Sequence, residues 1–120
     1  MAGVADGFNI RISKNGGFLP ALRLANLARR HELLCQLGCM VGETSILSAV
    51  GRRFLECVPG VAFAEGSYGW HLLRGDVVRK PIGFGYGGKP KLLPGLGWGV
   101  QVDPERLREF VRPGVIEIAL

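Results

Sequence analysis

The chain has 120 residues, which is enough for one hydrophobic core but not for two. Hydrophobic residues make up 48% and charged residues 21%, values of ordinary globular proteins that exclude a disordered tail and a fibrous chain. The net charge is +5, yet the fifteen lysines and arginines stand in ones and twos without a run of five. We therefore expect no nucleic-acid surface and consider a small anionic ligand instead.

The N-terminal part alternates between predicted strands and helices. Residues 8–12 alternate apolar with polar side chains, which is typical of a strand, and the glycine-rich residues 13–17 predict a sharp turn. Residues 19–33 place apolar side chains on one side, so they predict an amphipathic helix that covers a sheet. The almost wholly apolar run 33–37 predicts a parallel strand that is buried on both faces.

A second helix and a third strand come next. Thr44 or Ser45 can cap this helix, in which apolar residues recur every four positions over residues 46–58. Residues 61–64 predict another buried strand, and residues 70–74 predict a short helix. The resulting order, strand-helix-strand-helix-strand, is typical of a parallel sheet with right-handed crossovers.

The C-terminal part is rich in glycine and proline. Residues 77–102 predict irregular β structure across the end of the domain, with hairpin-like alternation at 84–86. A last helix is expected over residues 103–111, because an aspartate can cap it and a proline follows at its first position. Residues 114–118 predict one further short strand at an edge.

Cysteine and histidine usage bears on compartment and metal binding. The three cysteines are an odd number in apolar surroundings without CxxC spacing, so they predict buried thiols in a reducing compartment. His31 and His71 stand alone, which predicts no zinc site. No apolar stretch is long enough to span a bilayer, and the N-terminus lacks a basic region followed by an apolar one. We therefore expect a cytoplasmic protein that makes no contact with a membrane.

Three polar residues follow the three predicted strands: Lys14, Glu43 and Glu65. In parallel α/β folds ligands bind beyond the carboxyl ends of the strands. A lysine beside carboxylates at such a place can act as a general base, because burial and neighbouring charges tune its proton affinity. In the alternative interpretation Lys14 is a turn lysine with its head in water, and Glu43 merely favours the positive end of its helix.

Four segments of the chain resemble, in the right order, the mandelate racemase and muconate lactonizing branch of the enolase superfamily, which includes the muconate and chloromuconate cycloisomerases. The sixth strand and helix of that branch resemble NIRISKNGGFLPALRLANLARRHEL, and the seventh strand, loop and helix resemble LGCMVGETSILSAVGRRF. The eighth strand resembles AFAEGSYG, and the closing segment resembles LLPGLGWGVQVDPERLREF. The resemblance covers residues 8–112.

The fold that the resemblance implies is an α/β partial TIM barrel. Residues 8–75 would supply about three C-terminal strand-helix units, and residues 76–120 the Gly/Pro-rich closing segment and a terminal helix. The whole chain, residues 1–120, would then be a single C-terminal fragment of a longer barrel.

The activity that the resemblance implies is that of an isomerase or lyase of the cycloisomerase, racemase or epimerase type. Such an enzyme removes a proton alpha to a carboxylate with a lysine base, and a magnesium ion holds the enolate. Lys14 matches the sixth-strand lysine, and Glu43 matches the acidic residue near it. The VGET spelling has one residue more than the commoner MLES-like form, which weakens the match of Glu43. Glu65 falls where the branch places substrate-selecting residues.

The family's magnesium ligands belong to strands that this sequence does not contain, so the resemblance implies that the chain alone does not catalyse the reaction. We expect it to need the missing N-terminal part of the barrel and the capping domain, or to form a homo-oligomer, because its sheet edges would otherwise be uncovered. A second hypothesis is a noncatalytic interaction module whose positive surface binds an anionic partner. Salt-sensitive binding that does not depend on Lys14 would favour that hypothesis.

Overall fold

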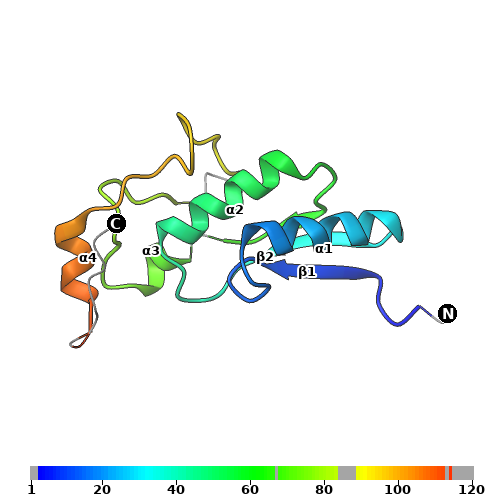
Figure 1. Ribbon diagram of the computed structural model, residues 1–120, viewed down its shortest axis with the longest axis horizontal. Helices are drawn as coiled ribbons and strands as arrows, with labels where there is room; N and C mark the ends of the chain where they lie inside the picture. The colour runs from blue at the N-terminus through cyan, green and yellow to red at the C-terminus, as the bar shows by residue number, and fades with distance from the viewer. Residues whose placement is uncertain (1–2, 67, 84–88, 113, 115–120) are drawn as a thin grey trace.

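The computed structural model of the chain describes residues 3–66, 68–83, 89–112 and 114. A parallel sheet with strand order β1-β2-β3 forms its centre, and helices α1 and α2 cross from each strand to the next (Figure 1). This arrangement confirms the predicted α/β partial barrel. The elements, in chain order, are β1 (Gly7–Arg11), α1 (Phe18–Arg30), β2 (Leu34–Gly38), α2 (Ser45–Cys57), β3 (Phe63–Ala64), α3 (Gly69–Leu72) and α4 (Pro104–Phe110).

The core lies between the sheet and helices α1 and α2. Ile10 and Phe54 are its largest fully buried side chains, with 1% and 0% of their surface exposed. Every second residue of β1 and β2 points into this core, because side chains alternate along a strand. The buried members of the cluster are Ile10, Ile12, Ala21, Ala25, Cys35, Leu37, Val50 and Phe54. The residues between them in the strands point to the opposite face of the sheet.

Helix α1 ends at Arg30, three residues before the end predicted from the apolar pattern. Glu32 adopts a left-handed conformation with φ of 56°. Its N–H donates to the carbonyl of Arg29, and the N–H of Leu33 donates to the carbonyl of Ala28, at 3.3 and 2.9 Å. These two bonds form a Schellman motif, which usually has glycine in the left-handed position. A glutamate there gave no sequence signal for the end of the helix.

The cap of helix α2 differs from the prediction. Thr44 occupies the N-cap position, but its side chain makes no capping hydrogen bond. Instead Oδ2 of Asp76 accepts hydrogen bonds from the backbone N–H and the hydroxyl of Ser45, at 2.9 and 2.6 Å. The Ser45 hydroxyl in turn accepts from the N–H of Ile82 at 2.9 Å. The helix is therefore capped by a residue 31 positions away in the sequence.

The closing segment runs across α2 towards α4 (Figure 1). Its described β structure is a single antiparallel bridge between Val78 and Val102. Helix α4 begins as predicted, because Oδ1 of Asp103 accepts from the N–H groups of Glu105 and Arg106 at 3.1 and 3.4 Å. The hairpin predicted at 84–86 lies outside the described residues, as does the strand predicted at 114–118 except for its first residue.

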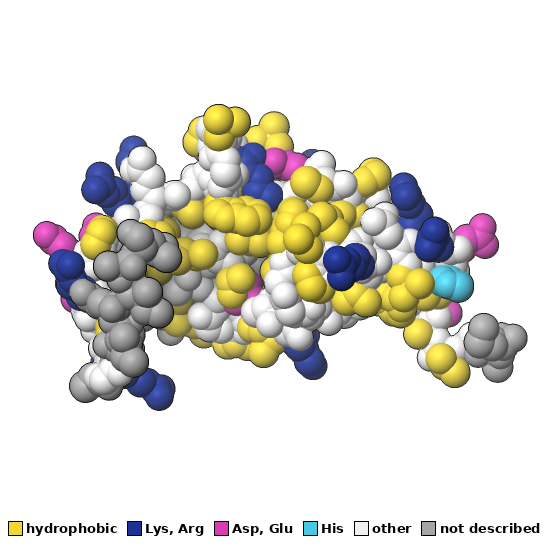
Figure 2. Space-filling view, viewed as in Figure 1, with side chains coloured by type: hydrophobic (Ala, Val, Ile, Leu, Met, Phe, Trp, Pro, Cys, Tyr) yellow, Lys and Arg dark blue, Asp and Glu magenta, His cyan; other side chains and the backbone are white. Residues whose placement is uncertain are grey.

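Many hydrophobic side chains lie at the surface of the molecule. Hydrophobic side chains gather across the middle of the face shown in Figure 2, beside scattered lysines and arginines. Large hydrophobic residues that are at least half exposed include Leu19, Leu34, Val41, Phe63, Trp70, Leu92 and Leu96. Within the described parts of the chain, no helix has both the length and the apolar character needed to cross a membrane.

Candidate functional site

The predicted site residues all follow the carboxyl ends of adjacent parallel strands. Residues of β1 and β2 pair in register from Gly7 with Leu34 to Arg11 with Gly38, and β2 pairs with β3 through Leu37 and Ala64. The turns after the three strands therefore leave the sheet at one edge, which is the edge where parallel α/β folds bind ligands.

Lys14 lies in the turn after β1 and is exposed. Its backbone N–H donates to the carbonyl of Arg11 at 3.0 Å, and Asn15 closes the same turn by accepting the N–H of Arg11 on its side chain at 2.8 Å. The Lys14 ammonium group forms no hydrogen bond or ion pair with a described residue. Its assignment as a base stays a prediction.

Glu43 lies in the loop between β2 and α2 and is half-buried. Its Oε1 accepts hydrogen bonds from the hydroxyl of Ser13 at 3.1 Å and from the backbone N–H of Met40 at 2.9 Å. The first bond connects the loop after β2 to the turn that carries Lys14. The structure thus brings Glu43 to the neighbour of Lys14 in the sequence.

Glu65 directly follows β3 and is also half-buried. Its Oε1 accepts from Nε2 of Gln36 at 2.6 Å, and its Oε2 accepts from the backbone N–H of Cys39 at 3.4 Å. Both oxygens of this carboxylate are therefore held by donors from β2 and the residue after it.

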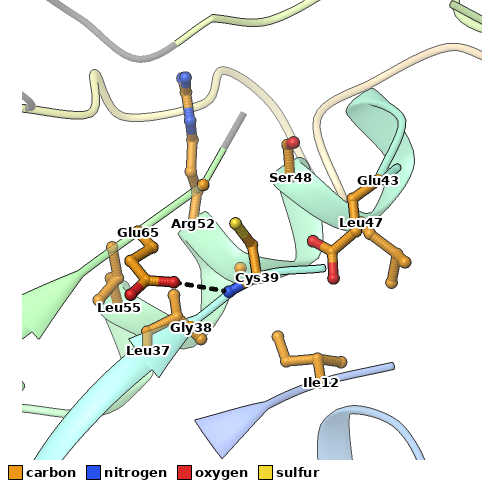
Figure 3. A pocket seen from close by; sticks show the side chains of 12 residues that line it. Ile12, Leu37, Gly38, Cys39, Glu43, Leu47, Ser48, Arg52, Leu55 and Glu65 are labelled. Atoms are coloured by element: carbon orange, nitrogen blue, oxygen red, sulfur yellow. Dashed lines mark hydrogen bonds between the residues drawn. The ribbon is translucent and has the colours of Figure 1, made fainter. Parts of the chain in front are cut away.

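Glu43 and Glu65 line the same small pocket, between the end of β2 and helix α2. In the close view they lie on either side of Cys39 (Figure 3). The pocket has a volume of about 20 Å³, which is room for about one water molecule. Burial raises the pKa of the Cys39 thiol; the charges of Glu43 and Glu65 raise it further, and the charge of Arg11 lowers it. The thiol therefore lies among three charged side chains.

Arg52 of α2 lines the opposite wall of this pocket and is 6% exposed. Its guanidinium donates to the carbonyls of Gly83 and Lys91, the latter at 3.2 Å, and so holds the closing segment against the helix. Burial lowers the pKa of this guanidinium. The basic side chain therefore has a structural position in the pocket wall.

The site also includes Gln36, Cys39 and Arg11, which the sequence patterns did not predict. Gln36 is the one polar side chain in the apolar run that becomes β2, and that interruption was the available signal. Nothing in the sequence marked the other two, because a cysteine in apolar surroundings and an arginine at a strand end are common. The pairing register alone brings them to the carboxylates.

The acidic side chains here are too few and too dispersed for a metal ion. Among the residues that the structure describes, no group of three or more His, Cys, Asp or Glu side chains is placed to hold one. The nearest set, Glu43 and Glu65, uses its oxygens as acceptors for side-chain and backbone donors. These residues do not fit a magnesium site by themselves.

Comparison with known proteins gives the same assignment at the level of a family. A family model described as enolase C-terminal domain-like matches residues 1–106. Muconate cycloisomerase 1-1 of Acinetobacter lwoffii is 26% identical over 115 residues, which are 95% of this chain and 30% of that protein. The N-succinyl-L-Arg/Lys racemase of Bacillus cereus is 45% identical over 47 residues, which are 39% of this chain and 12% of the racemase.

Two solved structures resemble the chain closely. The 2-chloromuconate cycloisomerase from Rhodococcus opacus 1CP has a TM-score of 0.73 at 30% identity, over 89% of this chain and 28% of that one. The N-succinyl Arg/Lys racemase from Bacillus cereus ATCC 14579 has a TM-score of 0.67 at 27% identity, over 88% and 27%. The chain thus spans at most about 30% of the length of these relatives.

Proposed function

Because the chain belongs to the enolase C-terminal domain-like family, we propose that it is the C-terminal catalytic part of an isomerase or lyase of the cycloisomerase, racemase or epimerase type. In this proposal Lys14 removes a proton from the carbon next to a substrate carboxylate. Glu43 holds the turn that carries Lys14, and Glu65 contacts the substrate. The names of the relatives, two cycloisomerases and a racemase, support the reaction class.

The observation that supports Lys14 most is the hydrogen bond between its neighbour Ser13 and Glu43, at 3.1 Å. This bond ties the turn after β1 to the loop after β2, so the lysine is attached to the part of the site that carries a carboxylate. A general base has to be held near the proton that it removes. The bond limits how far the turn can move away from the pocket.

The proposed reaction also needs groups and surroundings that this chain does not supply. A lysine works as a base in a site from which water is largely excluded, and Lys14 is exposed in this chain. The relatives have long segments that this chain does not span. In this proposal, segments that correspond to them supply the remaining barrel strands, the capping domain and the magnesium ligands. Magnesium would then stabilise the charge that develops on the substrate carboxylate. The partner is thus the rest of the barrel, or a second copy of this chain.

We further propose a cytoplasmic location. The three cysteines are all free thiols, which supports a reducing compartment. The prediction that they are buried is correct for Cys35 and wrong for Cys57, which is exposed at the end of α2.

Proton exchange tests the proposed function. An enzyme that carries this segment together with the rest of the barrel is incubated in D₂O with magnesium and a carboxylic acid that it turns over. We expect deuterium at the alpha carbon by NMR, and we expect Lys14→Ala to abolish that exchange. Lys89→Ala is the matched control, since Lys89 is an exposed lysine of the closing segment, and it should keep the exchange rate.

Two outcomes of this experiment would contradict the proposed function. If Lys14→Ala exchanged deuterium as fast as the unaltered enzyme, another group would be the base. If no carboxylic acid were exchanged at all but an anionic partner bound with strong salt dependence, the noncatalytic interaction module would be the better account.

A further inference from the structure

Arg11 is the last residue of β1 and points away from the core. Its neighbours Ile10 and Ile12 are both buried under the helices, and side chains alternate along a strand. In the register of the sheet it pairs with Gly38 of β2. Its side chain therefore lies on the face of the sheet opposite to α1 and α2.

Gly38 provides the room for this side chain. A Cβ atom at that position would lie 3.1 Å from Cγ of Arg11 and would overlap the side-chain amide of Asn9. The stem of Arg11 thus crosses β2 over a residue without a side chain. Its guanidinium reaches the loop beyond, where Nη1 lies 3.8 Å from Sδ of Met40.

The guanidinium has no anionic partner among the described residues. The two carboxylates of the site are already held by other donors: Ser13 and the N–H of Met40 bind Glu43, and Gln36 and the N–H of Cys39 bind Glu65. The planar guanidinium presents a fork of N–H groups that matches a carboxylate. Its described contact is a thioether, which is only a weak acceptor.

We propose that Arg11 is the anion-binding residue of this site, holding a carboxylate of a small ligand at its guanidinium, beyond the stem that crosses over Gly38. The location of the ligand rests on the proposed function; the proposal adds the group that recognises its charge. Lys14 and Arg11 would then have separate tasks, one on the reacting carbon and the other on a carboxylate.

The thiol of Cys39 provides a test that needs no turnover. Iodoacetate and iodoacetamide are nearly the same size and react in the same way: the thiolate forms a bond to the methylene carbon and iodide leaves. Only iodoacetate carries a carboxylate. A change in thiolate fraction or access alters both rates together, so the ratio of the two rates at Cys39 isolates the attraction of an anion. Peptide mass spectrometry of the 120-residue chain measures this ratio at each cysteine.

We expect Arg11→Gln to lower the iodoacetate-to-iodoacetamide ratio at Cys39 by about threefold to tenfold at low salt, because the variant removes a positive charge that acts on this thiol. Arg11→Lys keeps the charge and should keep most of the ratio. Arg30→Gln removes an exposed arginine at the C-terminal end of α1 and should leave the ratio at Cys39 unchanged. The exposed Cys57 serves as a second site whose ratio should not respond.

Two further measurements show whether a variant is folded and whether the position of the Arg11 side chain matters. Cys35 is buried, so its protection in the same digest shows whether a variant is folded. Gly38→Ala keeps Arg11 in the sequence but displaces its stem together with the Asn9 amide, so it should lower the ratio in the same direction as Arg11→Gln. An unchanged ratio at Cys39 in a folded Arg11→Gln chain would overturn the proposal.

The outcome separates this proposal from the proposed function. A ratio that falls in Arg11→Gln, together with undiminished deuterium exchange in Lys14→Ala, would keep the anion-binding arginine and remove the lysine base. An unchanged ratio together with lost exchange in Lys14→Ala would do the reverse.

Discussion

The side-chain amide of Gln36 donates a hydrogen bond of 2.6 Å to Oε1 of Glu65, across the step from β2 to the end of β3. The two residues are 29 positions apart, and Gln36 pairs in register with Phe63 of β3. A polar side chain in the middle of an otherwise apolar strand thus fixes the direction of a carboxylate that follows the next strand.

Replacing Gln36 with methionine should remove this bond and keep the volume of the side chain. We expect the free energy of unfolding to fall by about 1 to 2 kcal/mol, because a half-buried carboxylate loses a donor. Urea denaturation followed by circular dichroism measures the change. Gln101→Met, on an exposed glutamine of the closing segment, is the matched control and should change stability by less than about 0.5 kcal/mol. Equal stability of the two variants would show that the bond contributes nothing.

Alkylation of Cys39 should have an unusual pH dependence. Burial first, and then the charges of Glu43 and Glu65, raise the pKa of this thiol, while Arg11 lowers it. The rate of reaction with iodoacetamide should therefore rise at a higher pH in the folded chain than in urea. Glu43→Gln removes one of the raising charges and should move the midpoint to lower pH. Arg11→Gln should move it to higher pH, and a shift of both variants in the same direction would contradict this account.

The raised pKa values of the thiols also predict how the stability of the fold depends on pH. A thiol whose pKa is raised by folding favours the folded state while it is protonated. That contribution is complete below the unfolded pKa of about 8.5 and is lost as the pH rises through the higher folded value. Burial raises the pKa of Cys35 as well, so both thiols act in one direction. We expect the denaturation midpoint to fall between pH 8 and pH 10, and to fall less in Cys35→Ala/Cys39→Ala, when each is compared with its own value at pH 8.

Gly38→Ala should destabilise the sheet. Its new methyl group would meet the Asn9 amide and the Arg11 stem, and such overpacking costs about 1 to 3 kcal/mol. Gly42→Ala is the control, because nothing lies within 4 Å of the added carbon there. The difference in urea midpoint between the two variants is the measurement. If Gly38→Ala were as stable as Gly42→Ala, both side chains would have moved aside without cost.

Asp76→Ala should loosen the start of helix α2. The variant removes the acceptor for both the N–H and the hydroxyl of Ser45, and loss of a helix cap costs about 1 to 2 kcal/mol. Asp76→Asn keeps an acceptor oxygen without the charge, so its cost should be smaller. Hydrogen exchange of the first-turn amides of α2 follows the effect locally. Asp6→Ala, on an exposed aspartate before β1, should leave those amides unchanged.

Much of the fold could be predicted from local patterns. Period-two alternation marked β1, and the fourfold apolar repeat marked α2, because both depend on residues close in the sequence. The errors occurred where distant residues decide. The cap of α2 comes from Asp76, and the third strand is shorter than its apolar run, beginning at Phe63 rather than at residue 61. The early end of α1 depends on a left-handed glutamate that has no sequence signature.

The candidate site was predictable only in outline. Strand ends in a parallel sheet lie at one edge, so the positions after the strands drew attention to Lys14, Glu43 and Glu65. Which of them touch one another depends on side-chain reach across the sheet. That Gln36 takes up one oxygen of Glu65, and that Arg11 crosses over Gly38, follows from the pairing register and could not be read from spacing.

The strands lie in the sheet in the same order as in the chain, and each is joined to the next by one helix. Every pairing therefore closes only a short length of polypeptide, for which the entropic cost of loop closure is small. Such a segment can assemble progressively as it leaves the ribosome, with each new strand adding to an edge that is already formed. The strand pairing itself involves only residues 7–64, so it does not have to wait for the C-terminal part of the chain to be synthesised.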